Sequence, residues 1–143
     1  MSQPINIASH LCTMAERQPC TFAVVFPHGR DGSGRVAYTH FTYQQLNDES
    51  DRLARGFEQI GIGRGVRTVL MVKPSLEFFA TTFALFKVGA VPVLVDPGMG
   101  IANLKQCLAE AEPEAFIGIP KAHAARVVLG WAKASIRTCV TIG

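Results

Sequence analysis

Charged residues are scarce in this sequence, and so are the short motifs that mark most catalytic and metal sites. Only 17% of the 143 residues are charged and 48% are hydrophobic, whereas intrinsically disordered chains show the opposite balance. This composition excludes a disordered chain. The length predicts a single folded unit, and the low charge predicts that another surface covers part of it.

Clusters of positive charge are also absent. The net charge of +3 arises from 14 Lys and Arg against 11 Asp and Glu, and these residues are scattered along the chain. Proteins that bind nucleic acids concentrate basic residues on one face or stripe. We therefore expect no nucleic-acid partner.

The cysteines and histidines show no spacing typical of metal ligands. There is no CxxC pair, and no histidine is followed three or four residues later by His or Cys, so a zinc site is not expected. The cysteines are predicted to be buried thiols rather than disulfides, as in cytosolic proteins. The residues concerned are Cys12, Cys20, Cys107, Cys139, His10, His28, His40 and His123.

The sequence predicts a cytoplasmic protein. Its N-terminus lacks the basic region followed by an apolar region that marks a signal peptide. The apolar stretch from Phe78 to Val95 approaches the length of a membrane span, but Lys87, Gly89 and Pro92 interrupt it. We interpret this stretch as a buried helix followed by a buried strand, and expect no membrane span.

The N-terminal part of the chain predicts a helix, a β-hairpin and a second helix. Apolar residues at helical spacing precede Pro19, and two runs rich in β-branched and aromatic residues flank a Gly-rich turn. In the second helix, Thr42 and Gln45 form the pattern of a capping box, and Gly61 stands where a left-handed C-cap belongs. The predicted elements are a helix over 6–17, strands over 22–26 and 35–41, and a helix over 43–60.

Apolar strands then alternate with helices. The runs from Thr68 to Val72 and from Val91 to Val95 are typical of strands buried on both faces. The helix that Ser75 begins is apolar nearly all round and is expected to be covered on all sides. This order predicts a three-layer α/β fold over residues 1–143, a mostly parallel open sheet with helices on both faces. The expected strands are 68–72, 91–95, 115–119 and 136–142, and the expected helices are 75–88, 101–111 and 121–132.

Three glycine-rich segments are candidates for a phosphate-binding loop, which needs backbone N–H groups at the start of a helix. Gly29–Gly34 joins two strands and Gly61–Gly65 leads from a helix into a strand, so both are interpreted as turns. Asp96–Gly100 follows a strand and precedes a helix, at the sheet edge where α/β proteins bind ligands. It contains neither a Walker loop nor a GxGxxG pattern, which leaves a structural turn and a ligand-binding turn as its two interpretations.

Candidate acids, bases and nucleophiles are few. No G-x-S-x-G elbow is present, and Asp31, close after His28, is expected to form a turn. Asp96 stands at a strand end, where catalytic carboxylates occur, but Asp before Pro is also a common turn residue. Glu77 is expected to complement the dipole of its helix. The residues by themselves predict no catalytic, cofactor-binding or metal-binding residue.

Several segments resemble the adenylate-forming superfamily of acyl-CoA synthetases, luciferases and peptide-synthetase adenylation domains. Phe41–Leu46 is similar to the family's F-T-Y-x-E-L segment, Val72–Phe78 to its N-S-x-E-F segment, and Phe86–Pro97 to L-K-A-G-A-x-x-V-P-L-D-P. As in the family, the first of these segments is followed by a helix and then by the Gly-rich turn Gly61–Val66. The continuation Pro97–Gly100 resembles the fatty-acid–CoA ligase branch that includes the olefin β-lactone synthetases. That likeness implies a long-chain acyl or 3-hydroxyacyl carboxylate as substrate.

The resemblance covers nearly the whole chain but only the first part of the family's large N-terminal domain. The family's Ser-, Thr- and Gly-rich phosphate loop, magnesium-binding acid and C-terminal catalytic lysine have no counterpart in this sequence. The resemblance implies ATP, Mg²⁺ and coenzyme A as cofactors of the parent enzyme, with none of them bound by this chain alone. It also implies a chain that is inactive by itself. The apolar surface that such a fragment exposes predicts that it self-associates or is only marginally stable.

The expected function is therefore the N-terminal portion of an ATP-dependent fatty acid–CoA ligase or a related adenylate-forming enzyme. Two other functions remain compatible with the residues alone. One is a stand-alone, flavodoxin-like domain that binds a nucleotide or another small ligand at the Asp96–Gly100 turn. The other is a non-catalytic interaction module derived from the same fold.

Overall fold

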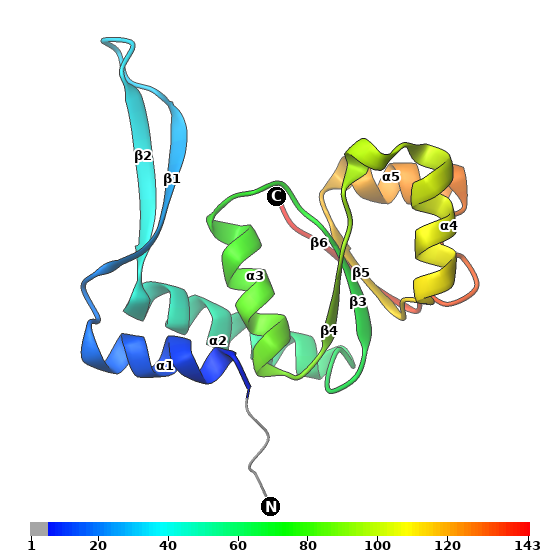
Figure 1. The fold of residues 1–143 in the computed structure, drawn as a ribbon, viewed down its shortest axis with the longest axis horizontal. Helices are drawn as coiled ribbons and strands as arrows, with labels where there is room; N and C mark the ends of the chain where they lie inside the picture. The colour runs from blue at the N-terminus through cyan, green and yellow to red at the C-terminus, as the bar shows by residue number, and fades with distance from the viewer. Residues whose placement is uncertain (1–5) are drawn as a thin grey trace, which may run out of the picture.

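The computed structural model describes residues 6–143, which form a β-hairpin, a four-stranded sheet and five α-helices (Figure 1). The order of elements follows the sequence prediction closely. The N-terminal elements are α1 (Ala8–Arg17), β1 (Phe22–Arg30), β2 (Val36–Thr42) and α2 (Tyr43–Gln59). The remaining elements are β3 (Arg67–Met71), α3 (Leu76–Lys87), β4 (Val91–Leu94), the short 3₁₀ helix η1 (Pro97–Met99), α4 (Ile101–Ala111), β5 (Ala115–Gly118), α5 (Pro120–Leu129) and β6 (Thr138–Thr141).

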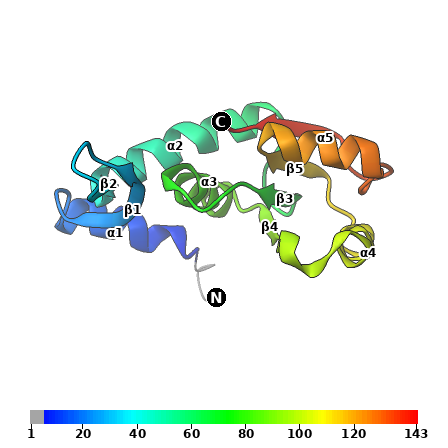
Figure 2. The ribbon, with the colours of Figure 1, turned by 90° about the horizontal axis from the view of Figure 1, so that it is seen from above.

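The central sheet is parallel throughout and has the strand order β4-β3-β5-β6. Helices α2 and α3 lie on one side of it, and α4 and α5 on the other (Figures 1 and 2). This arrangement confirms the predicted three-layer α/β fold. It follows from strand–helix–strand units in which each parallel connection must cross a face of the sheet.

Successive side chains of the central strands supply the cores on the two faces. Leu70 of β3 packs in the same cluster as Phe57 of α2 and Leu85 of α3. The neighbouring Val69 points the other way, into a cluster with Leu104 of α4 and Phe116 of β5, because side chains alternate along a strand. Both β3 and β5 are buried on both faces, as their continuous apolar runs predict.

Strand β4 departs from the prediction of a buried strand. It lies at the edge of the sheet, and Val91 and Leu94 are 47% and 61% exposed. Pro92 suits this position because it has no N–H to donate to a further strand. An apolar run predicts that a segment forms a strand. The place of that strand in the sheet depends on the path of the crossover connection before it, here through α3.

The two helix starts for which the sequence predicts a capping side chain, Thr42 and Ser75, are confirmed. Thr42 accepts a hydrogen bond from the Gln45 N–H at 3.2 Å, and Gln45 accepts one from the Thr42 N–H at 2.9 Å, which completes the capping box. Ser75 accepts one from the Phe78 N–H at 3.2 Å. The left-handed Gly61 ends the first of these helices, with a φ of 82°.

Helix α3 is covered from two sides, although its apolar surface predicted burial all round. The sheet and α2 cover one side, whereas α1 and the hairpin contribute Leu11 and Val24 to a cluster on the other. Within α3 only Glu77 is exposed, although its phenylalanines are half-buried rather than fully enclosed. The N-terminal elements thus form the additional layer.

The hairpin projects away from the body (Figure 1), and its turn is shorter than predicted. Strand β1 continues to Arg30, so the turn is confined to residues 31–35. Asp31 forms this turn, as expected: its carboxylate accepts hydrogen bonds from the Ser33 hydroxyl and the Arg35 N–H, which lower its pKa.

Other boundaries and burial predictions also need correction. Helix α5 ends at Leu129, before the predicted end at residue 132, because the left-handed Gly130 (φ 66°) stops it. Strand β6 begins only at Thr138. The cysteines are free thiols, but three are exposed and Cys12 is half-buried, so their predicted burial is wrong. Among residues 6–143, no helix is both long and apolar enough to cross a membrane.

Candidate functional site

A cavity of about 700 Å³ opens at the carboxyl ends of β3, β4 and β5. We call it the strand-end pocket. Its lining consists of residues 70–74 and 78 from the end of β3 and the start of α3, residues 94–96 from the end of β4, and residues 119, 121, 122, 125 and 131 from the end of β5 and the α5 region. Ligand-binding pockets typically have volumes of about 300–1,000 Å³.

The topology explains why a hollow forms at this place. The chain leaves β3 toward α3 on one face of the sheet and leaves the adjacent β5 toward α5 on the other. Connections that diverge from neighbouring parallel strands open a crevice outside the strand ends, where α/β proteins bind ligands. The sequence prediction placed Asp96 at this edge, and Asp96 lines the pocket.

The pocket has an apolar interior and a charged rim. Its interior includes the half-buried Val72, Phe78 and Ile119. Lys73 and Lys121 are exposed and lie with Asp96 among the lining residues, which leaves one net positive charge at the rim. Such a combination suits an amphipathic ligand with an apolar body and an anionic group.

Trp131 adds a buried hydrogen-bond donor to this lining. The side chain is 4% exposed, and its Nε1 has no hydrogen-bond partner among the described residues. Buried N–H groups in folded proteins nearly always have a partner. The Nε1 atom is itself enclosed by the chain, so Trp131 contributes an apolar wall to the pocket and no donor that a ligand in it could reach.

The Asp96–Gly100 turn does not form a phosphate cradle. The Asp96 carboxylate accepts a hydrogen bond from the Gly98 N–H at 2.8 Å, and its carbonyl accepts one from the Met99 N–H at 3.2 Å. These N–H groups are already satisfied within the turn, so they are not free to bind phosphate oxygens. Of the two interpretations left open by the sequence, the structure favours the structural turn.

The described residues also do not fit ATP or Mg²⁺. The interior of the strand-end pocket is apolar, whereas a triphosphate requires converging cations and N–H donors. Within residues 6–143, no three His, Cys, Asp or Glu side chains gather as a metal site would require. No step of a reaction with ATP is therefore assigned to these side chains.

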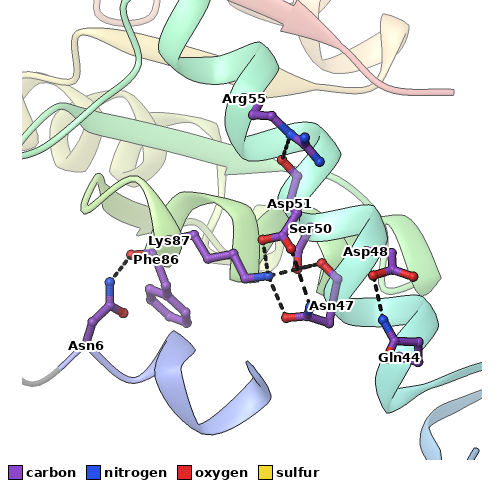
Figure 3. Close-up of polar contacts among 9 residues, drawn as sticks. All are labelled: Asn6, Gln44, Asn47, Asp48, Ser50, Asp51, Arg55, Phe86 and Lys87. Atoms are coloured by element: carbon purple, nitrogen blue, oxygen red, sulfur yellow. Dashed lines mark hydrogen bonds and ion pairs between the residues drawn. The ribbon is translucent and has the colours of Figure 1, made fainter. Parts of the chain in front are cut away.

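Lys87, a residue of the Phe86–Pro97 motif, belongs to a separate polar cluster between α2 and α3 (Figure 3). Its Nζ donates to the Asn47 carbonyl at 3.0 Å, to Asn47 Oδ1 at 2.9 Å and to Asp51 Oδ1 at 2.6 Å. The Lys87 side chain is only 11% exposed, and all three ammonium protons are used. This lysine therefore joins two helices and does not face the pocket residues.

Replacing Lys87 with methionine is expected to lower the free energy of unfolding by about 2 kcal/mol, since hydrogen bonds to charged groups contribute about 1.5–3 kcal/mol. Urea unfolding measures this loss. The exposed Lys133 provides the matched control, and Lys133→Met is expected to stay within about 0.5 kcal/mol of the wild type. Equal stability of the two variants would contradict the assigned role.

A double-mutant cycle with Asp51 tests the same contact directly. If Lys87 acts through Asp51, the combined Lys87→Met and Asp51→Asn changes should cost less than the sum of the single changes. Strict additivity would show that the two side chains are not coupled.

The remaining polar residues singled out by the sequence do not come together. His28 and His40 lie on the hairpin, whereas His10 lies on α1. His123 lies on α5, and its Nε2 is 2.9 Å from the Val140 carbonyl. Glu77 occupies the first turn of α3, as expected for a residue that complements the helix dipole. That no residue of this chain is catalytic stays a prediction.

Sequence reasoning missed Lys73, Lys121 and Trp131 as members of the site. Two of them were identifiable, because Lys73 directly follows a predicted strand and Lys121 stands at the start of the helix after another. The rule that places ligands at strand ends applies to all the parallel strands, and not only to the one before Asp96. Trp131 carried no such signal, because it reaches the pocket only through the fold of the segment after α5.

Comparison with known proteins agrees with this architecture. The AMP-binding enzyme family matches residues 12–142. The olefin β-lactone synthetase of Stenotrophomonas maltophilia is 55% identical over 145 aligned positions, which cover 100% of this chain and 26% of that protein. The olefin β-lactone synthetase of Xanthomonas campestris is 51% identical over 144 positions, again with 100% and 26% coverage. The chain thus spans about a quarter of the length of these relatives.

Solved structures show the same fold at lower sequence identity. A long-chain fatty-acid–CoA ligase from Archaeoglobus fulgidus superposes with a TM-score of 0.79 at 19% identity, covering 100% of this chain and 28% of that one. At this identity the likeness concerns the fold alone. The family match and the whole-chain identity of the synthetases carry the assignment: this chain belongs to the AMP-binding enzyme family.

Proposed function

We propose that this chain is the N-terminal part of an enzyme that activates a long-chain 3-hydroxy acid as its acyl adenylate. In this reaction a carboxylate oxygen attacks the α-phosphorus of ATP, and pyrophosphate leaves. The observation that carries the proposal is the 55% identity with an olefin β-lactone synthetase, because it extends over the whole chain. Membership of the AMP-binding family supports the dependence on ATP.

The hydroxyl group on the third carbon distinguishes this reaction from thioester synthesis. Its oxygen can attack the activated carboxyl carbon of the same molecule, lose its proton, close a four-membered lactone ring and release AMP. No thiol acceptor is needed. A fatty acid–CoA ligase would instead transfer the acyl group to coenzyme A and is the second candidate; the Pro97–Gly100 continuation resembles the branch that includes both kinds of enzyme.

We further propose that the 143-residue chain is one α/β unit of that enzyme and is inactive alone. Adenylation brings a carboxylate against a triphosphate, and this crowding of negative charge requires a cation and oriented donors. The strand-end pocket offers an apolar interior with lysines only at its rim. The phosphate loop, the Mg²⁺ site and the catalytic lysine would come from other parts of the enzyme.

The test compares this chain with the full-length protein that contains it. The full-length protein should exchange labelled pyrophosphate into ATP when supplied with long-chain 3-hydroxy acids, whereas the chain alone should not. Mass spectrometry of the product then separates the two candidates: a lactone formed without coenzyme A supports the synthetase, and a thioester formed only with coenzyme A supports the ligase. Absence of exchange with every acid would refute adenylation.

Exposed apolar residues support the proposal that the isolated chain self-associates. Tyr38 on the hairpin, Leu94 on the edge strand and Val128 on α5 are 65%, 61% and 81% exposed, and apolar surface of this kind favours association. Sedimentation velocity should show species larger than 15.5 kDa at high concentration. A monomer that binds no hydrophobic dye would contradict this expectation.

A further inference from the structure

We draw no further inference here: the strongest candidate, the outer edge of β6, which within residues 6–143 pairs with β5 alone and so presents backbone hydrogen-bonding groups to a further strand, carries none, because the chain spans about a quarter of the length of its relatives and nothing in the structure shows what covers that edge.

Discussion

Replacing Phe116 with alanine is expected to lower the free energy of unfolding by about 3–5 kcal/mol, the range for large aromatic side chains in a core. Phe116 is fully buried in the centre of the sheet and packs with Val69, Leu104 and Trp131. Its ring also lies 5.1 Å from the His123 ring and 5.6 Å from the Arg126 guanidinium carbon. Because domains of this kind are stable by only about 5–15 kcal/mol, this loss removes a large part of the total.

Urea unfolding followed by fluorescence measures this effect directly, because the single tryptophan of the chain, Trp131, lies in the same cluster. The matched control is Phe22→Ala on the hairpin, where the side chain is 57% exposed. This change is expected to cost less than about 1 kcal/mol. A similar loss for both variants would mean that the cluster around Phe116 does not determine stability.

Replacing Gly118 with alanine is expected to cost about 2–3 kcal/mol, although only one methyl group is added. The new Cβ would lie 2.7 Å from Phe116 Cε1 and 3.1 Å from Ala122 Cβ, closer than carbon atoms pack. Overfilling a packed core in this way typically costs about 1–3 kcal/mol. The strand end must stay without a side chain because α5 begins directly against it.

A second substitution tests this explanation for Gly118. Phe116→Leu removes the Cε1 atom that the new methyl group would meet, so the double variant should lose less stability than the sum of the two single variants. Gly63→Ala serves as the control, since a Cβ there would meet nothing within 4 Å. Additive losses in the double variant would show that the steric explanation is wrong.

Local sequence patterns predicted those parts of the fold that are decided by neighbouring residues. The capping box at Thr42 and the helix end at Gly61 depend on contacts within a few residues, and both formed as expected. The central strands β3 and β5 were also predicted correctly, because burial on both faces requires a continuous apolar run. The family resemblance came from such segments as well.

The direction of a chain crossover placed β4 at the edge of the sheet. Val91–Leu94 is as apolar as the central strands, but the connection through α3 carries β4 past β3 to the outside of the sheet. Its position is set by the direction of a crossover, and Pro92, which has no N–H to donate, is the one local signal of an edge strand that it contains. The prediction that β4 is a strand was therefore correct, and the prediction that it is buried was wrong.

The same distinction applies to the candidate site and to Lys87. The sequence placed Asp96 at a strand end, but only the strand order brings it into one pocket with Lys73 and Lys121. Lys87 is 36 residues from Asp51 and 40 from Asn47, a separation that no local pattern spans. The sequence by itself determined the helices and strands, because these depend on neighbouring residues. It also determined the family, because the matching segments are continuous stretches of sequence. Packing between distant elements determined the pocket, its charged rim and the contact between α2 and α3.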